Sequence, residues 1–370
     1  MQMNRQKWFI LRLKILSLED KIIFFAQFPG EINGATITNS RVVSISGQYF
    51  IVETLNISIK NNKDNVFQAI YRPLKLIRGI WRILESNSST SSTVYFTPSS
   101  KGLSLSRELI IITLINVFGV KRKIIHIHDG NFFENKGLLK KLFLKAILMS
   151  KFEFIVPSNV VKNECLKWNE KSKVNILYGY SRYELKEILY CKEVRFINFY
   201  GNFQIKKGLY EFLAIIDRLS IVGNLRINII GSPDEIDLNE LSSLIHSNRN
   251  SKYIEVVQIK NPKELIPYSI GAIIVSPTYG ETFGLAVLEC MSLGMVPVVN
   301  AVGGLKELVV HNDSGYLVEN NSIDGYIDCI DILLSSRSNY TEMRERAFNQ
   351  SKRFSRKNFN NEILKILRDD

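Results

Sequence analysis

Short apolar runs alternate with helical patterns along most of the chain, and this alternation restricts the possible folds more than any other feature. Residues 271–299 show it most clearly. The run 271–275 is apolar throughout, as is typical of a strand buried on both faces. A loop with proline and glycine follows, and residues 283–293 then carry apolar side chains at helical spacing. Gly294 is placed to end that helix, and 296–299 is the next apolar strand. A strand–loop–helix–strand unit of this kind is typical of a parallel α/β sheet, whose ligands bind beyond the carboxyl ends of its strands.

Two carboxylates indicate that this loop and the helix after it could bind a ligand. Glu281 lies in the loop, and Glu289 lies eight residues later, a little over two helical turns away. The amides of Phe283, Gly284 and Leu285 are expected at the helix entrance, where unpaired N–H groups and the helix dipole favour an anion. Carboxylates accept hydrogen bonds from hydroxyl groups, so a nucleotide sugar fits this set. Spacing alone leaves open that both acids are ordinary solvated residues.

The stretch resembles the E-x7-E region of retaining GT-B glycosyltransferases of family 4. The match continues beyond the two acids for about forty residues in register. It includes Ser276-Pro277, Gly294-x-x-Pro297-Val298-Val299, Gly303-Gly304-x-x-Glu307 and the segment 312–318. The resemblance implies that Glu281 contacts the donor sugar and that Glu289 contacts the ribose hydroxyls.

A second loop follows the apolar run 194–200 and reads Gly201-Asn202-Phe203-Gln204-Ile205-Lys206-Lys207-Gly208. It resembles the family's G-R-x4-K-G loop, whose arginine and lysine hold the donor phosphates. Lys207 matches the lysine, which is a sound phosphate ligand. Asn202 stands where the arginine is common, so this chain has one cation fewer at the leaving group.

Two histidines lie in a predicted strand near the middle of the N-terminal half. His126 and His128 are two residues apart, so they point to the same face of the strand. His128 is nearer the carboxyl end, where it could donate to a developing charge or position a hydroxyl. A satisfied core histidine is the alternative. The family resemblance implies that a histidine here lies near the donor sugar and the acceptor, and we assign that role to His128.

The chain begins its α/β pattern with the apolar strand 21–26, followed by a loop containing Gly34 and an expected helix. This is a Rossmann-like opening without the G-x-G-x-x-G fingerprint of nicotinamide enzymes. The resemblance places Gly34 near the donor diphosphate, although a simple turn glycine would look the same.

The length of 370 residues and the two series of strands and helices predict two domains. We expect an N-terminal Rossmann-like acceptor domain over 1–185 and a C-terminal donor domain over 186–370. The resemblance implies the GT-B fold class, in which two doubly wound parallel-sheet domains face each other across a cleft and the last helix packs back on the first domain.

Charge is distributed unevenly between these halves. Residues 1–185 contain 27 Lys or Arg against 13 Asp or Glu, whereas residues 186–370 contain 21 against 23. This excess indicates a polyanionic partner for the N-terminal half. The basic amphipathic segment 133–148 and the basic, apolar start 1–18 are candidates for contact with an anionic membrane surface, and an ordinary surface helix is the alternative for the former. No recognisable nucleic-acid module is present.

Together these features predict transfer of a sugar, with retention, from a UDP- or GDP-sugar to a glycan or lipid-linked acceptor in bacterial surface polysaccharide synthesis. A GT-B-fold sugar-nucleotide epimerase and a basic nucleic-acid-binding protein are the alternatives. We expect a cytoplasmic protein, peripheral on the inner face of the cytoplasmic membrane, because no apolar run of about 18 residues is present. Its four cysteines and four histidines form no metal-binding pattern, so neither a metal nor a cofactor is expected.

Overall fold

The computed structural model describes residues 21–28, 34–57, 77–85, 92–99, 104–134, 137–189, 191, 193–221, 223–259 and 261–369. The N-terminal segment 1–18 and the residues just before Gly34 lie outside this part of the chain. The described residues form two compact units. Unit 1 contains the described residues within 1–157, 161–177 and 360–370, and unit 2 contains those within 158–160 and 178–359.

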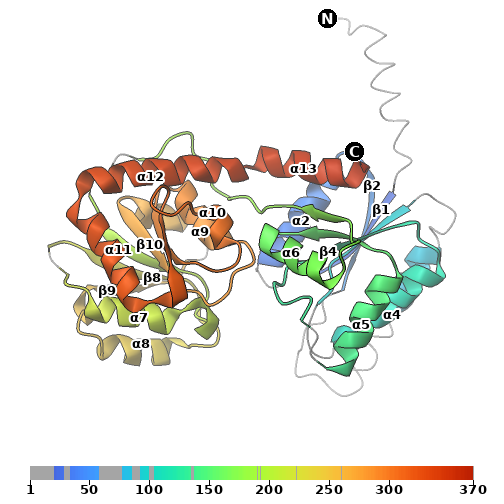
Figure 1. The fold of residues 1–370 in the computed structure, drawn as a ribbon, viewed down its shortest axis with the longest axis horizontal. Helices are drawn as coiled ribbons and strands as arrows, with labels where there is room; N and C mark the ends of the chain where they lie inside the picture. The colour runs from blue at the N-terminus through green and yellow to red at the C-terminus, as the bar shows by residue number, and fades with distance from the viewer. Residues whose placement is uncertain are drawn as a thin grey trace, which may run out of the picture. The chain divides into compact units, whose positions relative to one another are not determined.

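Unit 1 is built on a six-stranded sheet in the order β2-β1-β3-β4-β5-β6, and all of its pairings are parallel. Its strands are β1 (Lys21–Ala26), β2 (Ile51–Asn56), β3 (Ser92–Phe96), β4 (Arg122–His126), β5 (Glu153–Val156) and β6 (Val174–Ile176). The helices are α2 (Gly34–Ser46), α4 (Ser104–Val117), α5 (Leu138–Met149) and α6 (Asn159–Trp168), with a further helical segment at 77–85. Figure 1 shows α4 and α5 packed side by side on this unit.

Unit 2 has a second parallel sheet of six strands, in the order β12-β11-β10-β7-β8-β9. The strands are β7 (Phe196–Tyr200), β8 (Arg226–Ile230), β9 (Ile254–Val257), β10 (Ala272–Ser276), β11 (Val296–Asn300) and β12 (Tyr316–Val318). The helices are α7 (Leu209–Arg218), α8 (Leu238–His246), α9 (Leu285–Ser292), α10 (Leu305–Leu308), α11 (Ile323–Ser335) and α12 (Arg337–Ser351). In Figure 1, α7 and α8 lie on one side of the strands and α12 lies on the other.

The inner strands of both sheets are buried on both faces because helices cover them, and this explains their continuous apolar sequences. In unit 2 every side chain from Ala272 to Val275 is at most 1% exposed. The predicted strand–loop–helix–strand unit is confirmed as β10, α9 and β11, with β10 and β11 parallel neighbours. Gly294 has a left-handed backbone (φ 80°) immediately after this helix, as expected for a helix stop.

The boundary between the units falls at 177/178, ahead of the expected position near 185. The described residues of 178–195 form no helix or strand, so no periodic pattern in the sequence could place the boundary within this segment. The final helix α13 (Arg356–Arg368) contributes residues from 360 onward to unit 1. There Arg122 donates from its guanidinium to the carbonyls of Ile366 and Leu367, at 2.6 and 2.5 Å.

The loop after β7 packs tightly on the loop after β10, and a glycine makes this possible. Gly208 has a left-handed backbone (φ 80°), and a Cβ built on it would lie closer than 3.0 Å to the carbonyl of Pro277. Gly223 has a similar backbone (φ 69°), but a Cβ there would meet nothing within 4 Å. Substitutions at Gly208 and Gly223 can therefore distinguish the cost of backbone strain from the cost of steric overlap.

We predict that Gly223→Ala costs roughly 1 kcal/mol of unfolding free energy, the cost of a left-handed alanine. Gly208→Ala should cost at least about 2 kcal/mol more, because the new methyl group also displaces the Pro277 loop. Urea unfolding followed by circular dichroism measures both values. Equal losses in the two variants would show that the loops can separate freely.

Candidate active site

Two predicted site residues of unit 2 meet directly. Lys207 ends the short 3-10 turn η1 (Ile205–Lys207) after β7, and Glu281 lies in the loop after β10. Their side chains form an ion pair with Nζ and Oε2 2.6 Å apart, and they are 30% and 19% exposed. Because β7 and β10 are parallel neighbours, both loops leave the same carboxyl edge of the sheet. The structure therefore brings these two predicted residues together, and their roles in binding and catalysis stay predictions.

Backbone contacts fix the position of this pair. The carbonyl of Lys206 accepts hydrogen bonds from the Tyr279 amide at 3.0 Å and from the Thr278 hydroxyl at 3.2 Å. The carbonyl of Glu281 accepts from the Gly304 amide at 3.0 Å. A Cβ on Gly303 would overlap that same carbonyl, so the paired glycines allow the close approach. The loops after β7, β10 and β11 are thus linked to one another by direct backbone contacts.

The entrance of α9 lies directly after Glu281. The helix begins at Leu285, with Gly284 in a left-handed conformation (φ 102°, ψ 48°) at the N-cap and with no side chain capping it. Within the described part of the chain, the amides of Phe283, Gly284 and Leu285 donate no hydrogen bond. The side chain of Phe283 is 3% exposed and packs beside Tyr178 and Phe354. Its amide and that of Gly284 precede the helix, in contrast to the expected helix start at 283.

Glu289 is buried and belongs to a cluster that the sequence did not predict. Both of its oxygens accept from Arg182, at 2.6 Å from Nε and 2.8 Å from Nη2. The hydroxyl of Tyr200, at the end of β7, donates to Oε2 at 3.4 Å. Hydrogen bonds to Glu289 raise the pKa of the Arg182 guanidinium, and burial together with the Glu289 carboxylate raises the pKa of Tyr200. The carboxylate is thus paired and oriented by a residue 107 positions earlier in the chain.

Asn202 points to a different partner. Its amide nitrogen lies 3.5 Å from Asp234, which also accepts a hydrogen bond from Gln204. The next acid, Glu235, accepts from the backbone amide of Ile205 at 2.9 Å. The position where the family commonly has arginine therefore faces an acidic loop after β8, and the structure does not bring Asn202 into contact with Lys207 or Glu281.

Glu307 is a further polar residue whose partners sequence reasoning missed. It belongs to α10 and accepts hydrogen bonds from the Asn159 side chain at 2.7 Å and the Val160 amide at 3.2 Å. The hydroxyl of Tyr178 donates to it at 2.9 Å, and burial with this hydrogen bond raises the pKa of Tyr178 to about 12. Glu307 is part of the motif Gly303-Gly304-x-x-Glu307, so the sequence indicated this residue. Its partners lie in distant segments that carry no recognisable motif, so they could not be predicted.

The remaining two predicted residues belong to unit 1. His128 lies just beyond β4, and its Nε2 is 3.0 Å from the Asn39 side-chain oxygen. Its ring and that of His126 have centroids 4.1 Å apart, which confirms that both point to one face. Gly34 is exposed and opens α2, where its carbonyl accepts from the Thr38 hydroxyl at 2.8 Å. The roles of both residues stay predictions.

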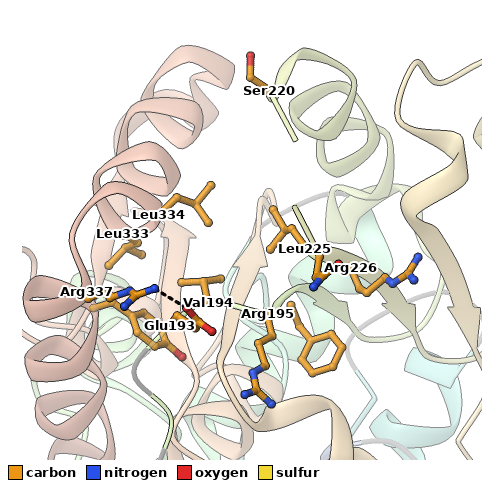
Figure 2. Close-up of a pocket in the computed structure, with 12 residues that line it drawn as sticks. Glu193, Val194, Arg195, Ser220, Leu225, Arg226, Leu333, Leu334 and Arg337 are labelled. Carbon is orange, nitrogen blue, oxygen red and sulfur yellow. Dashed lines mark hydrogen bonds and ion pairs between the residues drawn. The ribbon is translucent and has the colours of Figure 1, made fainter. Parts of the chain in front are cut away.

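A pocket of about 650 Å³ opens at a different place in unit 2 (Figure 2). Its lining includes Val194 and Leu225, which precede β7 and β8, and Leu334 of α11. An ion pair between Glu193 and Arg337 crosses it at 2.9 Å. The pocket therefore lies at the amino edge of the sheet, opposite the loops that carry Lys207 and Glu281, and it contains none of the predicted site residues.

Comparison with known proteins gives a family match that lies within unit 2. The model of the family described as "Glycosyl transferases group 1" matches residues 184–351. A GDP-Man:Man(3)GlcNAc(2)-PP-Dol alpha-1,2-mannosyltransferase of Dictyostelium discoideum is 40% identical over 91 residues, which cover 24% of this chain and 18% of that protein. A D-inositol 3-phosphate glycosyltransferase of Corynebacterium urealyticum is 27% identical over 180 residues, which cover 46% of this chain and 42% of that protein. The chain thus matches less than half the length of these relatives.

The similarity of the fold extends further than the similarity of the sequence. The crystal structure of HepE from Anabaena in complex with UDP-glucose has a TM-score of 0.71 at 13% identity, covering 95% of this chain and all of that one. At this identity the comparison shows the fold alone. With the two six-stranded parallel sheets, it confirms the GT-B fold class.

The Arg182–Glu289 pair generates a prediction about stability. Arg182→Met leaves a buried carboxylate without its partner and should lower the unfolding free energy by about 2 kcal/mol at pH 7, since the pair is only partly shielded from water. Glu289→Gln combined with Arg182→Met should recover at least half of that loss. A double-mutant cycle in urea measures this coupling, and additive losses would mean that the two side chains do not interact in solution.

Proposed function

We propose, from the match of residues 184–351 to the family of glycosyl transferases group 1, that the chain transfers a sugar from a nucleoside-diphosphate sugar to a glycan or lipid-linked acceptor. The observation that carries the proposal is the 2.6 Å contact of Lys207 with Glu281, next to the uncapped entrance of α9. At this edge of the sheet, the cation and the unpaired amides can bind a phosphate, and the carboxylate can accept hydrogen bonds from hydroxyl groups.

The departing diphosphate is the group on which this site acts most strongly. Lys207 and the amides of Phe283, Gly284 and Leu285 supply positive charge where negative charge develops as the glycosidic bond breaks. Preorganised charge of this kind commonly accounts for more of an enzyme's rate enhancement than any other effect. When donor binds, its phosphate replaces the Glu281 carboxylate as the partner of the Lys207 ammonium.

The two acids serve different parts of the donor in this proposal. Glu281 accepts hydrogen bonds from the sugar hydroxyls, and Glu289 accepts from the ribose. Arg182 orients Glu289 through two hydrogen bonds, which suits a residue that accepts hydrogen bonds from a ligand. Asn202 contributes no cation, so Lys207 bears a larger share of phosphate binding than it would beside an arginine. We also propose retention at the anomeric carbon and no requirement for a metal.

Substitution of the pair tests the proposal directly. Lys207→Ala and Glu281→Gln should each lower transfer at least about a hundred-fold, because each removes a group that stabilises the transition state. Lys206→Ala is the matched control: its side chain is exposed and its contacts to the neighbouring loop are made by the backbone. Wild type and variants are assayed against UDP-, GDP- and ADP-sugars with an NMR assignment of the product anomer.

Unchanged turnover in Lys207→Ala or Glu281→Gln, with the protein folded, would overturn the assigned roles. An inverted anomer would contradict retention. Formation of an epimer of the donor without any acceptor would replace the transferase proposal by that of a sugar-nucleotide epimerase.

We further propose that the acceptor is lipid-linked, in bacterial surface polysaccharide assembly at the inner face of the cytoplasmic membrane, and that α5 of unit 1 contacts the bilayer. The outer stripe of this helix alternates apolar and cationic residues. Its apolar members are 47–74% exposed, and α5 contains no acid. The stripe consists of Leu138, Lys141, Leu142, Lys145, Leu148 and Met149. Such a face fits an anionic membrane surface. No helix among the described residues is long and apolar enough to cross a bilayer.

Vesicle flotation tests this contact. Lys141→Gln with Lys145→Gln should weaken binding to anionic vesicles roughly thirty-fold, since each lysine near the surface contributes about 1 kcal/mol. The control removes Lys167 and Lys171 from the α6 region, where Lys167 already pairs with Glu164. Binding that does not depend on lipid charge or salt would contradict the proposed membrane contact. Salt-sensitive binding to nucleic acid in place of vesicles would favour the nucleic-acid alternative.

A further inference from the structure

One buried asparagine of unit 1 links the ends of three strands. Asn39 lies in α2 and is 2% exposed. Its amide nitrogen donates to the carbonyl of Gln27, just after β1, at 2.9 Å and to the hydroxyl of Thr97, just after β3, at 3.3 Å. Its amide oxygen faces Nε2 of His128, just after β4, at 3.0 Å. All three strand ends belong to the carboxyl edge of the sheet, where ligands bind in such folds.

The orientation of this amide follows from its partners. The carbonyl of Gln27 can only accept a hydrogen bond, so the atom of Asn39 facing it must be the nitrogen. A flipped amide would set two oxygens against each other there. The oxygen of Asn39 therefore faces His128, and Nε2 of that histidine must carry the proton it donates. The neutral ring then leaves Nδ1 unprotonated, and within the described residues Nδ1 has no hydrogen-bond partner.

The surroundings of His128 also disfavour a charged ring. Burial lowers its pKa to about 4. Its packed neighbour His126 is itself buried, with a pKa well below the usual value, and contacts the hydroxyl of Tyr95 from β3. The adjacent Asp129 turns back to accept from the Asn131 amide at 3.1 Å. No described carboxylate contacts the imidazole, so nothing offsets the cost of placing a cation there.

We infer that Asn39 is a positioning residue that holds His128 as the neutral Nε2–H tautomer, so that Nδ1 accepts a hydrogen bond from a hydroxyl group of a ligand. That the hydroxyl belongs to a sugar rests on the proposed function. At neutral pH, His128 therefore accepts a hydrogen bond at its unprotonated Nδ1. It neither protonates a leaving group nor supplies a positive charge.

The tautomer is measured without any assay of activity. The chain has four histidines, His126, His128, His246 and His311, so single His→Gln variants assign every imidazole in a ¹⁵N-histidine-labelled protein. We expect His128 to show a protonated Nε2 and an unprotonated Nδ1 from pH 8 down to about 5. A protonated Nδ1, or titration of His128 above pH 6, would overturn the inference.

Substitution of Asn39 provides a second test of the inference. Asn39→Asp places a carboxylate against Nε2–H and should raise the pKa of His128 by about one unit or more, whereas Asn131→Asp adds the same charge to the exposed loop and should shift it much less. Asn39→Ala removes the acceptor, and a mixture of tautomers should appear in the spectrum. If the spectrum does not change in Asn39→Ala with the protein folded, Asn39 does not set the tautomer.

Kinetics connect the tautomer to the reaction. In Asn39→Asp the transfer rate should fall as pH drops through the raised pKa of His128, because protonation removes the Nδ1 acceptor, while the wild type shows no such ionisation above about pH 5. A rate that instead rises as His128 is protonated would contradict the acceptor role. If the wild type transfers no sugar at all, the proposed function fails, and the NMR result still decides whether Asn39 sets the tautomer.

Discussion

The contact between Lys207 and Glu281 is the interaction on which the rest of the site depends. It exists because two parallel strands, β7 and β10, lie next to each other and send their loops out at the same edge. Glycines at 208 and 303 let these loops and the next one approach within hydrogen-bonding distance. The cation and the carboxylate are therefore held by backbone packing, which is the preorganisation that a charge-stabilising site needs.

The sequence predicted this part of the structure because the information is local. Continuous apolar strands indicate a parallel sheet whose ligands bind at the carboxyl edge, and the resemblance of the loops after β7 and β10 to family motifs implied that Lys207 and Glu281 share one site. The uncapped start of α9 was predicted within two residues. Its exact position depends on Gly284, whose left-handed backbone delays the helix until Leu285.

The partners of these residues could not be predicted in the same way. Arg182 lies near the start of unit 2, in a segment whose described residues show no periodic pattern, and only the fold brings it to Glu289. Asn39 lies in a helix with little amphipathic character, and its importance depends on three strand ends meeting beside it. Polar pairing between distant segments is decided by tertiary structure, whereas apolar periodicity already appears in a short window of sequence.

A crystal structure of the protein soaked with UDP or GDP tests the central claim most directly, because it locates a diphosphate independently of any acceptor. The account predicts that the terminal phosphate lies within hydrogen-bonding distance of the Lys207 ammonium and the Gly284 amide, with the ribose beside Glu289. A nucleotide bound at the amino edge of the sheet, or one that leaves the Lys207–Glu281 pair intact, would contradict it.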